Sequence, residues 1–309
     1  MPTLAKIMGL VSIPTVTPFY PGTEDVNFDA MEQLIDFAIR NKFADSIILT
    51  GTTAEFHALS DDERIQIWKV AKQAIADRVP MVAGTGAAST RAALRLCAEA
   101  EKLGVDAIMV VAPFYSKPTQ AGIENHYRRI ASAVTTPILL YNIPLFTGVN
   151  IDPDTFVRLT SLPNVKGIKE EAGIAPTQAT RFAMLAPSDF DIYCGDDTMV
   201  LQVLPQRGVG VVSGGAQIVG GHMQKMIAAY FNGDNRTASE IYFKMAPFFE
   251  ALNQNGRINP IPILRGAIEM ATGIPVGPPR SPLAPATKEE LAVVRKTLQS
   301  LEVVEAVAV

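Results

Sequence analysis

The fold is decided by residues 106–144, DAIMVVAPFYSKPTQAGIENHYRRIASAVTTPILLYNIP, which contain two strand-like runs with a helical segment between them. The runs DAIMVVAP (106–113) and PILLYNIP (137–144) are short, apolar and bounded by turn residues, as buried strands are. The intervening IENHYRRIASAVT (123–135) has the apolar spacing of an amphipathic helix. A regular alternation of strand and helix indicates parallel strand pairing.

The same alternation extends in both directions from this unit. Further strand-like runs are VSIPTVTP from Val11, DSIILTG from Asp45, PMVAGTG from Pro80, NVKGIKE from Asn164, DIYCGDD from Asp191 and GVGVVSGG from Gly208. The total of about eight is typical of a closed α/β barrel. An open doubly wound sheet would alternate in the same way, but no G-x-G-x-x-G turn follows the first strand. We therefore predict a (β/α)₈ TIM barrel.

The pattern changes after the eighth run. Long helices are predicted over 223–234, 235–254, 263–272 and 288–301, with no strand between them. We expect a barrel over residues 1–230 followed by a C-terminal helical region over 231–309.

Composition narrows the class of function. The 309 residues carry 27 Lys and Arg against 31 Asp and Glu, a net charge of −4 without basic runs, which argues against a nucleic-acid partner. No apolar stretch reaches the length of a membrane span, and prolines interrupt the N-terminal apolar residues, so we expect a cytoplasmic protein. The two cysteines, Cys97 and Cys194, have no Cys or His spaced for zinc and are expected to be reduced structural thiols without a metal.

The sixth run ends in Lys169, at the barrel end where catalytic groups gather. Strand alternation places Lys169 on the same face as Gly167, so an inward lysine would have room beside its amine. Burial lowers the pKa of a lysine, and the neutral amine can attack a ketone to form an imine. The alternative is a solvated lysine at a strand end, which is the usual state of lysine.

Two neighbouring strand ends offer groups that suit this chemistry. Tyr141 closes the fifth run with the parity of Leu139, and an inward phenol could transfer the protons that imine formation requires. The second run is followed by Gly51, Thr52 and Thr53, whose hydroxyls and backbone N–H groups could hold a carboxylate. An ordinary amphipathic tyrosine and a helix-capping threonine turn are the alternatives.

Six landmarks occur in order along nearly the whole chain: GTTAE at Gly51, APFYSKP at Ala112, YNIP at Tyr141, GIKE at Gly167, GDD at Gly195 and NPIPI at Asn259. With them the chain resembles the dihydrodipicolinate synthase and N-acetylneuraminate lyase family, which also contains keto-deoxy sugar-acid aldolases and dehydratases. The resemblance implies a TIM barrel with a C-terminal helical region.

The resemblance also implies roles for individual residues. Lys169 would form the Schiff base, so no cofactor is expected, and Tyr141 would be the proton relay. Thr52 and Thr53 would bind the pyruvate carboxylate, and the Thr53 hydroxyl would link Tyr141 to a second tyrosine. That second tyrosine matches Tyr115, which would reach into the site of an adjacent subunit. A homo-oligomer is therefore implied, commonly a tetramer built as a dimer of dimers.

Later strands contribute further implied positions. The carbonyl of Gly195 would lie near the site, and Val212 and Ser213 would line it. Phe56 and His57 look more like keto-acid lyase and dehydratase members than like synthases. His57 could contact a hydroxylated substrate, and a surface or capping histidine is the alternative.

One departure bears on the substrate. Where dihydrodipicolinate synthases carry an arginine for the carboxylate of the aldehyde, this chain has Phe146. An aromatic ring cannot replace a charge-assisted bidentate contact unless Arg257, Arg280 or Lys117 supplies the cation. We therefore expect a class I lyase acting on pyruvate or a related 2-oxo acid and an aldehyde, with keto-deoxy sugar-acid or hydroxy-oxo-acid aldolase or dehydratase activity preferred.

Three alternatives stay open at this point. The first is 4-hydroxy-tetrahydrodipicolinate synthase, which joins pyruvate and aspartate semialdehyde. The second is a noncatalytic barrel that binds a 2-oxo acid. The third takes SGGA at Ser213 as the phosphate-binding loop of a different barrel enzyme, because phosphate sites often follow strands seven and eight.

Overall fold

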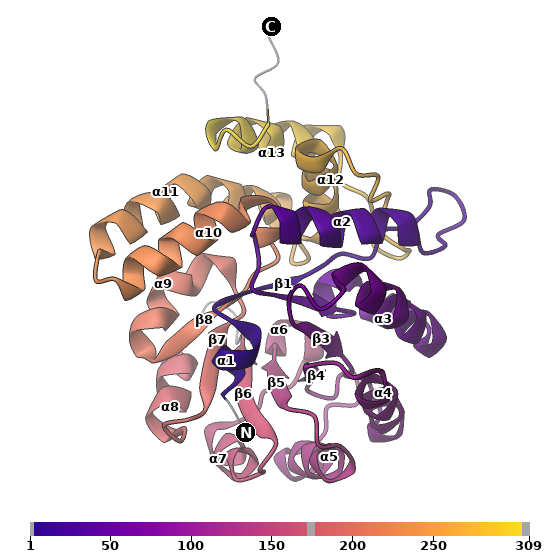
Figure 1. The fold of residues 1–309 in the computed structure, drawn as a ribbon, viewed down its shortest axis with the longest axis vertical. Helices are drawn as coiled ribbons and strands as arrows, with labels where there is room; N and C mark the ends of the chain where they lie inside the picture. The colour runs from indigo at the N-terminus through magenta and orange to yellow at the C-terminus, as the bar shows by residue number, and fades with distance from the viewer. Residues whose placement is uncertain (1–2, 172–176, 305–309) are drawn as a thin grey trace, which may run out of the picture.

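The computed structural model describes residues 3–171 and 177–304, and its eight parallel strands close into a barrel in chain order (Figure 1). The strands are Val11–Pro14 (β1), Ser46–Leu49 (β2), Met81–Gly84 (β3), Ala107–Val111 (β4), Ile138–Asn142 (β5), Val165–Glu170 (β6), Asp191–Cys194 (β7) and Gly208–Val212 (β8). The predicted (β/α)₈ barrel is confirmed, and each observed strand lies within one of the eight apolar runs.

Helices surround the strands as an outer ring (Figure 1). The main ones are Phe28–Arg40 (α2), Asp61–Ile75 (α3), Thr90–Leu103 (α4), Gln120–Ala133 (α5), Pro153–Thr160 (α7), Thr177–Leu185 (α8) and Ala216–Phe231 (α10), with the short Val200–Val203 (α9) after β7. Several begin at side chains that accept a hydrogen bond from the first turn, as Ser60 does in a capping box with Glu63.

Strand alternation divides the core into two parts. Residues such as Ile47 and Ile108 face outward and pack under the helices, whereas Ile48, Leu139 and Tyr141 belong to a separate cluster inside the barrel. The predicted inward direction of Tyr141 is confirmed. In the register of the sheet, Tyr141 on β5 lies beside Lys169 on β6, so the two side chains enter the barrel at the same level.

A short N-terminal helix that the sequence analysis did not predict, Leu4–Met8 (α1), covers one end of the barrel (Figure 1). Leu4 and Met8 are fully buried in the interior cluster. A Cβ atom on Gly167 would lie 2.9 Å from Leu4 Cδ1 and 2.6 Å from the carbonyl oxygen of Asp191. The space at Gly167 is therefore filled from below by α1, and it does not lie beside the amine of Lys169 as we had predicted.

The C-terminal region is helical, as predicted. Helices Asn235–Leu252 (α11), Ile261–Thr272 (α12) and Lys288–Ser300 (α13) gather on the side of the barrel next to α10 (Figure 1). A buried ion pair of 2.8 Å between Arg265 of α12 and Glu55, which follows β2, ties this region to the barrel. The division into two units near residue 230 stays a prediction.

Two smaller features complete the description. Both Cys97, in α4, and Cys194, at the end of β7, are free and buried. In the part of the chain that the structure describes, no helix is long and apolar enough to cross a membrane.

Candidate active site

A cavity of about 160 Å³ opens at the carboxyl ends of the strands. Its wall combines strand ends and the loops after them with residues from α11 and α12. The residues that the sequence analysis selected and that line the cavity are Thr52, Thr53, Tyr141, Phe146, Lys169, Gly195 and Val212. The strand-end convergence expected of this fold has therefore brought seven of the eleven predicted residues to one place.

The amine of Lys169 belongs to a short polar chain with Glu171 and Tyr141. Its Nζ is 3.0 Å from Oε2 of Glu171 and 4.1 Å from the centroid of the Tyr141 ring. The Tyr141 hydroxyl donates to the same Glu171 oxygen at 2.9 Å. Because Lys169 and Tyr141 are almost completely buried, these contacts operate with little screening by water.

The protonation state of Lys169 differs from the one we predicted. Burial alone disfavours the ammonium form, but the charge of Glu171 and the phenol of Tyr141 outweigh burial and raise the pKa of Lys169 above its ordinary value. Burial also raises the pKa of Glu171 and of Tyr141. A raised pKa favours the ammonium form of Lys169, which must lose a proton before it can attack a ketone.

Gly195, in the loop after β7, leaves room for the side chains of Lys169 and Glu171. A Cβ atom there would lie 2.9 Å from Lys169 Cε and 2.7 Å from Glu171 Cβ. Both distances are shorter than real carbon contacts, so a larger residue at position 195 would displace the lysine or the carboxylate.

The threonine turn after β2 is a 3₁₀ helix over Thr52–Ala54. Both Thr52 and Thr53 line the cavity, and an interaction with Thr52 partly offsets the rise that burial causes in the pKa of Tyr141. The linking role that the resemblance implies for Thr53 stays a prediction. Gly51 lies behind them, in a separate small hollow next to Met109.

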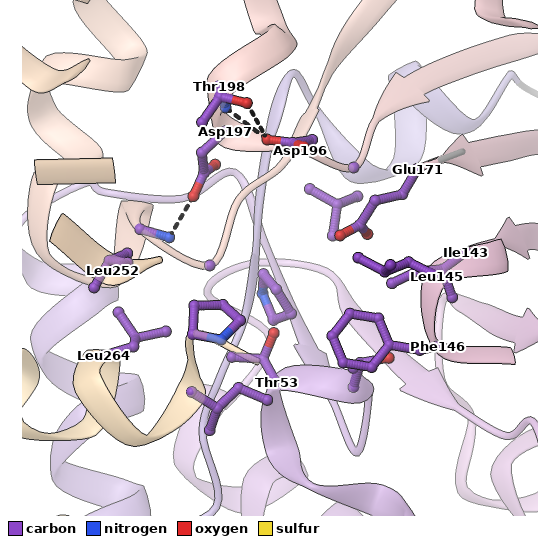
Figure 2. Close-up of a pocket in the computed structure, with 18 of the residues that line it drawn as sticks. Thr53, Ile143, Leu145, Phe146, Glu171, Asp196, Asp197, Thr198, Leu252 and Leu264 are labelled. Carbon is purple, nitrogen blue, oxygen red and sulfur yellow. Dashed lines mark hydrogen bonds between the residues drawn. The ribbon is translucent and has the colours of Figure 1, made fainter. Parts of the chain in front are cut away.

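Backbone N–H groups in the loop after β8 are already hydrogen-bonded to side chains of the protein. Asp197 Oδ2 accepts a hydrogen bond of 2.8 Å from the Gly215 N–H (Figure 2). Ser213 Oγ accepts one of 2.9 Å from the Ala216 N–H. These are donors that a phosphate would need, so the phosphate-loop alternative loses its support. Ser213 itself is fully buried and does not line the cavity, whereas Val212 and Gly215 do.

Asp197 yields a stability prediction. Its other oxygen, Oδ1, is buried without a hydrogen-bond partner among the described residues, and burial raises the pKa of Asp197 to about 6. Because the folded-state pKa is raised, the stability associated with protonated Asp197 is present at low pH and lost as pH rises through about 6.

We expect the free energy of unfolding of Asp197→Asn to be about 1–2 kcal/mol higher than that of the unmodified protein at pH 8. At pH 4 the two free energies should be equal, since the asparagine amide is neutral at both pH values and Asp197 is protonated at the lower one. Urea unfolding of both proteins at the two pH values measures this difference. An equal difference at both values would contradict the assignment to ionisation.

Lys169 is the one cationic side chain among the described residues that line the cavity. Arg257 is paired with Glu290 at 2.6 Å, and Arg280 is paired with Glu63. Neither of these, nor Lys117, lines the cavity. The cation that we considered as a substitute for the missing arginine is therefore not supplied by these three residues.

Carboxylate side chains line one side of the cavity. Figure 2 shows Glu171 and Asp196 on one wall, with Leu145 and Phe146 on a neighbouring apolar one. The sequence analysis missed Glu171, although the alternation that selected Lys169 also places residue 171 on the inner face.

Besides Gly51 and Ser213, two more predicted residues lie outside the cavity. His57 is exposed and packs edge-on against Phe56, with ring centroids 5.9 Å apart. Tyr115 is 93% exposed and has a φ of 70°, a left-handed conformation that is uncommon for an aromatic residue. Within one chain, neither residue contributes to the cavity wall.

Comparison with known proteins adds to this geometry. Residues 6–301 match the model of the dihydrodipicolinate synthetase family. The chain belongs to that family. It is accordingly a lyase of the class I Schiff-base type, and the noncatalytic alternative is set aside.

Similar members of the dihydrodipicolinate synthetase family include enzymes named 4-hydroxy-tetrahydrodipicolinate synthase. The one from Moorella thermoacetica is 39% identical over 282 residues, covering 91% of this chain and 94% of that protein. The one from Cyanothece is 40% identical, covering 95% and 98%. Among solved structures, dihydrodipicolinate synthase from Cyanidioschyzon merolae with lysine bound has a TM-score of 0.91 at 34% identity, covering 96% of this chain and 99% of that one.

Proposed function

We propose that this lyase binds pyruvate as an imine on Lys169 and joins the resulting enamine to an aldehyde, without a cofactor. The observation that supports this proposal is the buried amine of Lys169 at the mouth of the barrel, in contact with Glu171 and with the ring of Tyr141. An iminium nitrogen withdraws electrons from the neighbouring carbon, which makes the methyl group acidic enough to form the enamine.

Aspartate semialdehyde is the aldehyde that we propose first, so that the activity is that of 4-hydroxy-tetrahydrodipicolinate synthase. The names of the relatives from Moorella and Cyanothece support it. This choice reverses the order predicted from the sequence, where keto-deoxy sugar acids came first. Aspartate semialdehyde carries an ammonium group as well as a carboxylate, and the carboxylates of the cavity wall suit the former.

A neutral, hydroxylated aldehyde is the second candidate, and Phe146 is the observation that favours it. Phe146 lines the cavity, and no described cation other than that of Lys169 reaches the wall. A substrate carboxylate placed there would lack a bidentate partner, whereas hydroxyl groups could bind Thr53 or Thr198.

The test compares kcat/KM for pyruvate plus aspartate semialdehyde with kcat/KM for cleavage of a panel of keto-deoxy sugar acids. Efficient synthesis with aspartate semialdehyde supports the first candidate. Preferential cleavage of a sugar acid overturns it in favour of the second.

Phe146→Arg is expected to raise kcat/KM for aspartate semialdehyde by about tenfold, because a guanidinium supplies the planar pair of donors that a carboxylate requires. Steady-state kinetics of both proteins measure the change. Phe146→Gln is the matched control, since it offers a polar group without charge and should leave most of the gain unrealised. An equal gain with glutamine would argue against carboxylate recognition at this position.

We also propose that the enzyme works as a homo-oligomer, a tetramer built as a dimer of dimers, in which Tyr115 completes a neighbouring site. The exposure and backbone conformation of Tyr115 support a contact beyond its own chain. The cytoplasm stays the location predicted from the sequence.

A further inference from the structure

Glu171 occupies a position where imine formation needs a proton acceptor. One of its oxygens, Oε2, contacts both Lys169 Nζ at 3.0 Å and the Tyr141 hydroxyl at 2.9 Å. The side chain follows directly after β6 and enters the cavity, as Figure 2 shows. A single carboxylate oxygen therefore bridges the amine that becomes the imine and the phenol that faces it.

The local backbone is built to admit this carboxylate. A Cβ atom on Gly195 would lie 2.8 Å from Glu171 Oε2, in addition to its contact with Glu171 Cβ. Only glycine at position 195 leaves the oxygen in its place between the amine and the phenol.

The charges around Glu171 keep its proton affinity high. Burial has the largest effect and raises the pKa of Glu171, and the neighbouring carboxylate of Asp196 acts in the same direction. Lys169 and the hydroxyl of Tyr141 act in the opposite direction without cancelling the increase. The side chain is 22% exposed to the cavity, which leaves it accessible to a bound substrate.

We propose that Glu171 is a catalytic residue that carries protons from the Lys169 nitrogen, through the Tyr141 hydroxyl, to the ketone oxygen that leaves as water. This inference rests on the proposed imine at Lys169. It adds a third group to the lysine and tyrosine already placed in the reaction.

The protons balance over two passes. In the first pass, Lys169 Nζ gives a proton to Glu171, the freed lone pair forms the N–C bond as the C–O π bond opens, and the alkoxide takes a proton from Tyr141, which Glu171 restores. In the second pass, the nitrogen of the carbinolamine gives Glu171 another proton, which reaches the hydroxyl through Tyr141 as the C–O bond breaks. Water leaves, the iminium keeps the third proton, and Glu171 is ionised again, ready to act as its counter-ion.

Glu171→Gln separates this role from simple packing, because glutamine has the same length and can still accept from Tyr141 but cannot take up a proton. Removing the carboxylate leaves burial to lower the pKa of Lys169, so more of the amine is neutral. We expect acetylation of Lys169 by acetic anhydride, without pyruvate, to become about tenfold faster at pH 7, as a one-unit fall in pKa predicts.

Imine formation should change in the opposite direction. We expect it to slow on the order of a hundredfold in Glu171→Gln, the usual range for a lost general acid–base group. Mixtures with pyruvate are quenched with borohydride at set times, and label on the peptide of Lys169 is measured. Glu171→Asp retains a carboxylate and should recover part of the rate.

Glu250→Gln is the matched control, because it removes one negative charge from an exposed position of α11 that does not line the cavity. Both of its rates should equal those of the unmodified protein. Imine formation in Glu171→Gln at the unmodified rate overturns the inference, and so does a loss of both reactions, which would indicate a damaged site. Absence of any label in the unmodified protein overturns the proposed function and the inference together, so the two failures are distinguishable.

Discussion

Reduction with borohydride in the presence of pyruvate is expected to leave a 1-carboxyethyl group on Lys169 and to inactivate the protein irreversibly. The hydride converts the imine into a secondary amine that can no longer exchange with water. Peptide mass spectrometry locates the modification. Label on another lysine, with Lys169 unmodified, would contradict the mechanism.

Lys169→Met should accordingly lose at least about 10⁴-fold in kcat, because the nucleophile that forms the covalent intermediate is removed and no other described cation lines the cavity. Lys166→Met is the matched control. Lys166 is on the same strand, with the opposite parity and only partly buried, so its removal should leave turnover within about twofold. Equal losses in the two variants would indicate a structural effect on β6.

The barrel could be predicted because its signals are local. Each strand is a short apolar run closed by polar residues, and counting such runs sufficed to identify eight of them. Helix α1 could not be predicted in this way, since five residues contain too little periodicity to be recognised. Its position depends on packing of Leu4 under Gly167, residues far apart in the sequence that meet only once the barrel has closed.

In the site, too, residues on strands could be predicted and features that depend on tertiary contacts could not. Lys169 and Tyr141 could be placed because strand parity fixes their direction and barrel topology makes β5 and β6 neighbours. The separate roles of Thr52 and Thr53 rest on the family resemblance alone, because both lie in a 3₁₀ turn, where successive side chains point about 120° apart and strand parity no longer applies. The sign of the Lys169 pKa shift was wrong because it depends on Glu171, whose contact with the amine appears only in three dimensions.

The substrate prediction depends on the residue at position 146. The replacement of arginine by Phe146 predicts a loss of anion binding, and the structure places Phe146 on the cavity wall with no cation other than Lys169 among the described residues that line it. The relatives from Moorella and Cyanothece are nevertheless named 4-hydroxy-tetrahydrodipicolinate synthase, and that activity is the one we propose first. The comparison of kcat/KM for aspartate semialdehyde and for keto-deoxy sugar acids decides between the missing contact at Phe146 and the similarity over nearly the whole chain.

The second large effect is expected from mixing two inactive variants. Tyr115→Phe should lose most of its activity if the Tyr115 hydroxyl transfers protons in a site, yet Tyr115 is 93% exposed and outside the cavity of its own chain. Lys169→Ala should have no nucleophile. Each variant alone is therefore expected to be nearly inactive, for different reasons.

Co-refolding the two variants in equal amounts should restore activity to about a quarter of the unmodified level if each site combines its own Lys169 with Tyr115 of an isologous neighbour. Random pairing makes half of the dimers mixed. In a mixed dimer, the chain carrying Tyr115→Phe retains Lys169 and receives an intact tyrosine from the other chain, so one of its two sites is complete. The measurement is the specific activity of mixed oligomers whose composition has been verified by native mass spectrometry.

Recovery of a quarter of the unmodified activity distinguishes a shared site from a site within one chain, because a site within one chain gives no recovery. If Tyr115 acted within its own chain, every site in a mixed dimer would lack either the lysine or the tyrosine hydroxyl, and activity would stay at the level of the separate variants. Mixing Lys169→Ala with Tyr141→Phe provides the matched control. Tyr141 is buried in the same barrel interior as Lys169, so each site takes both residues from one chain. Every chain in this mixture carries one of the two substitutions, so no site is complete. That mixture should remain inactive, and recovery there would show that contaminating unmodified protein, not a shared site, produced the signal.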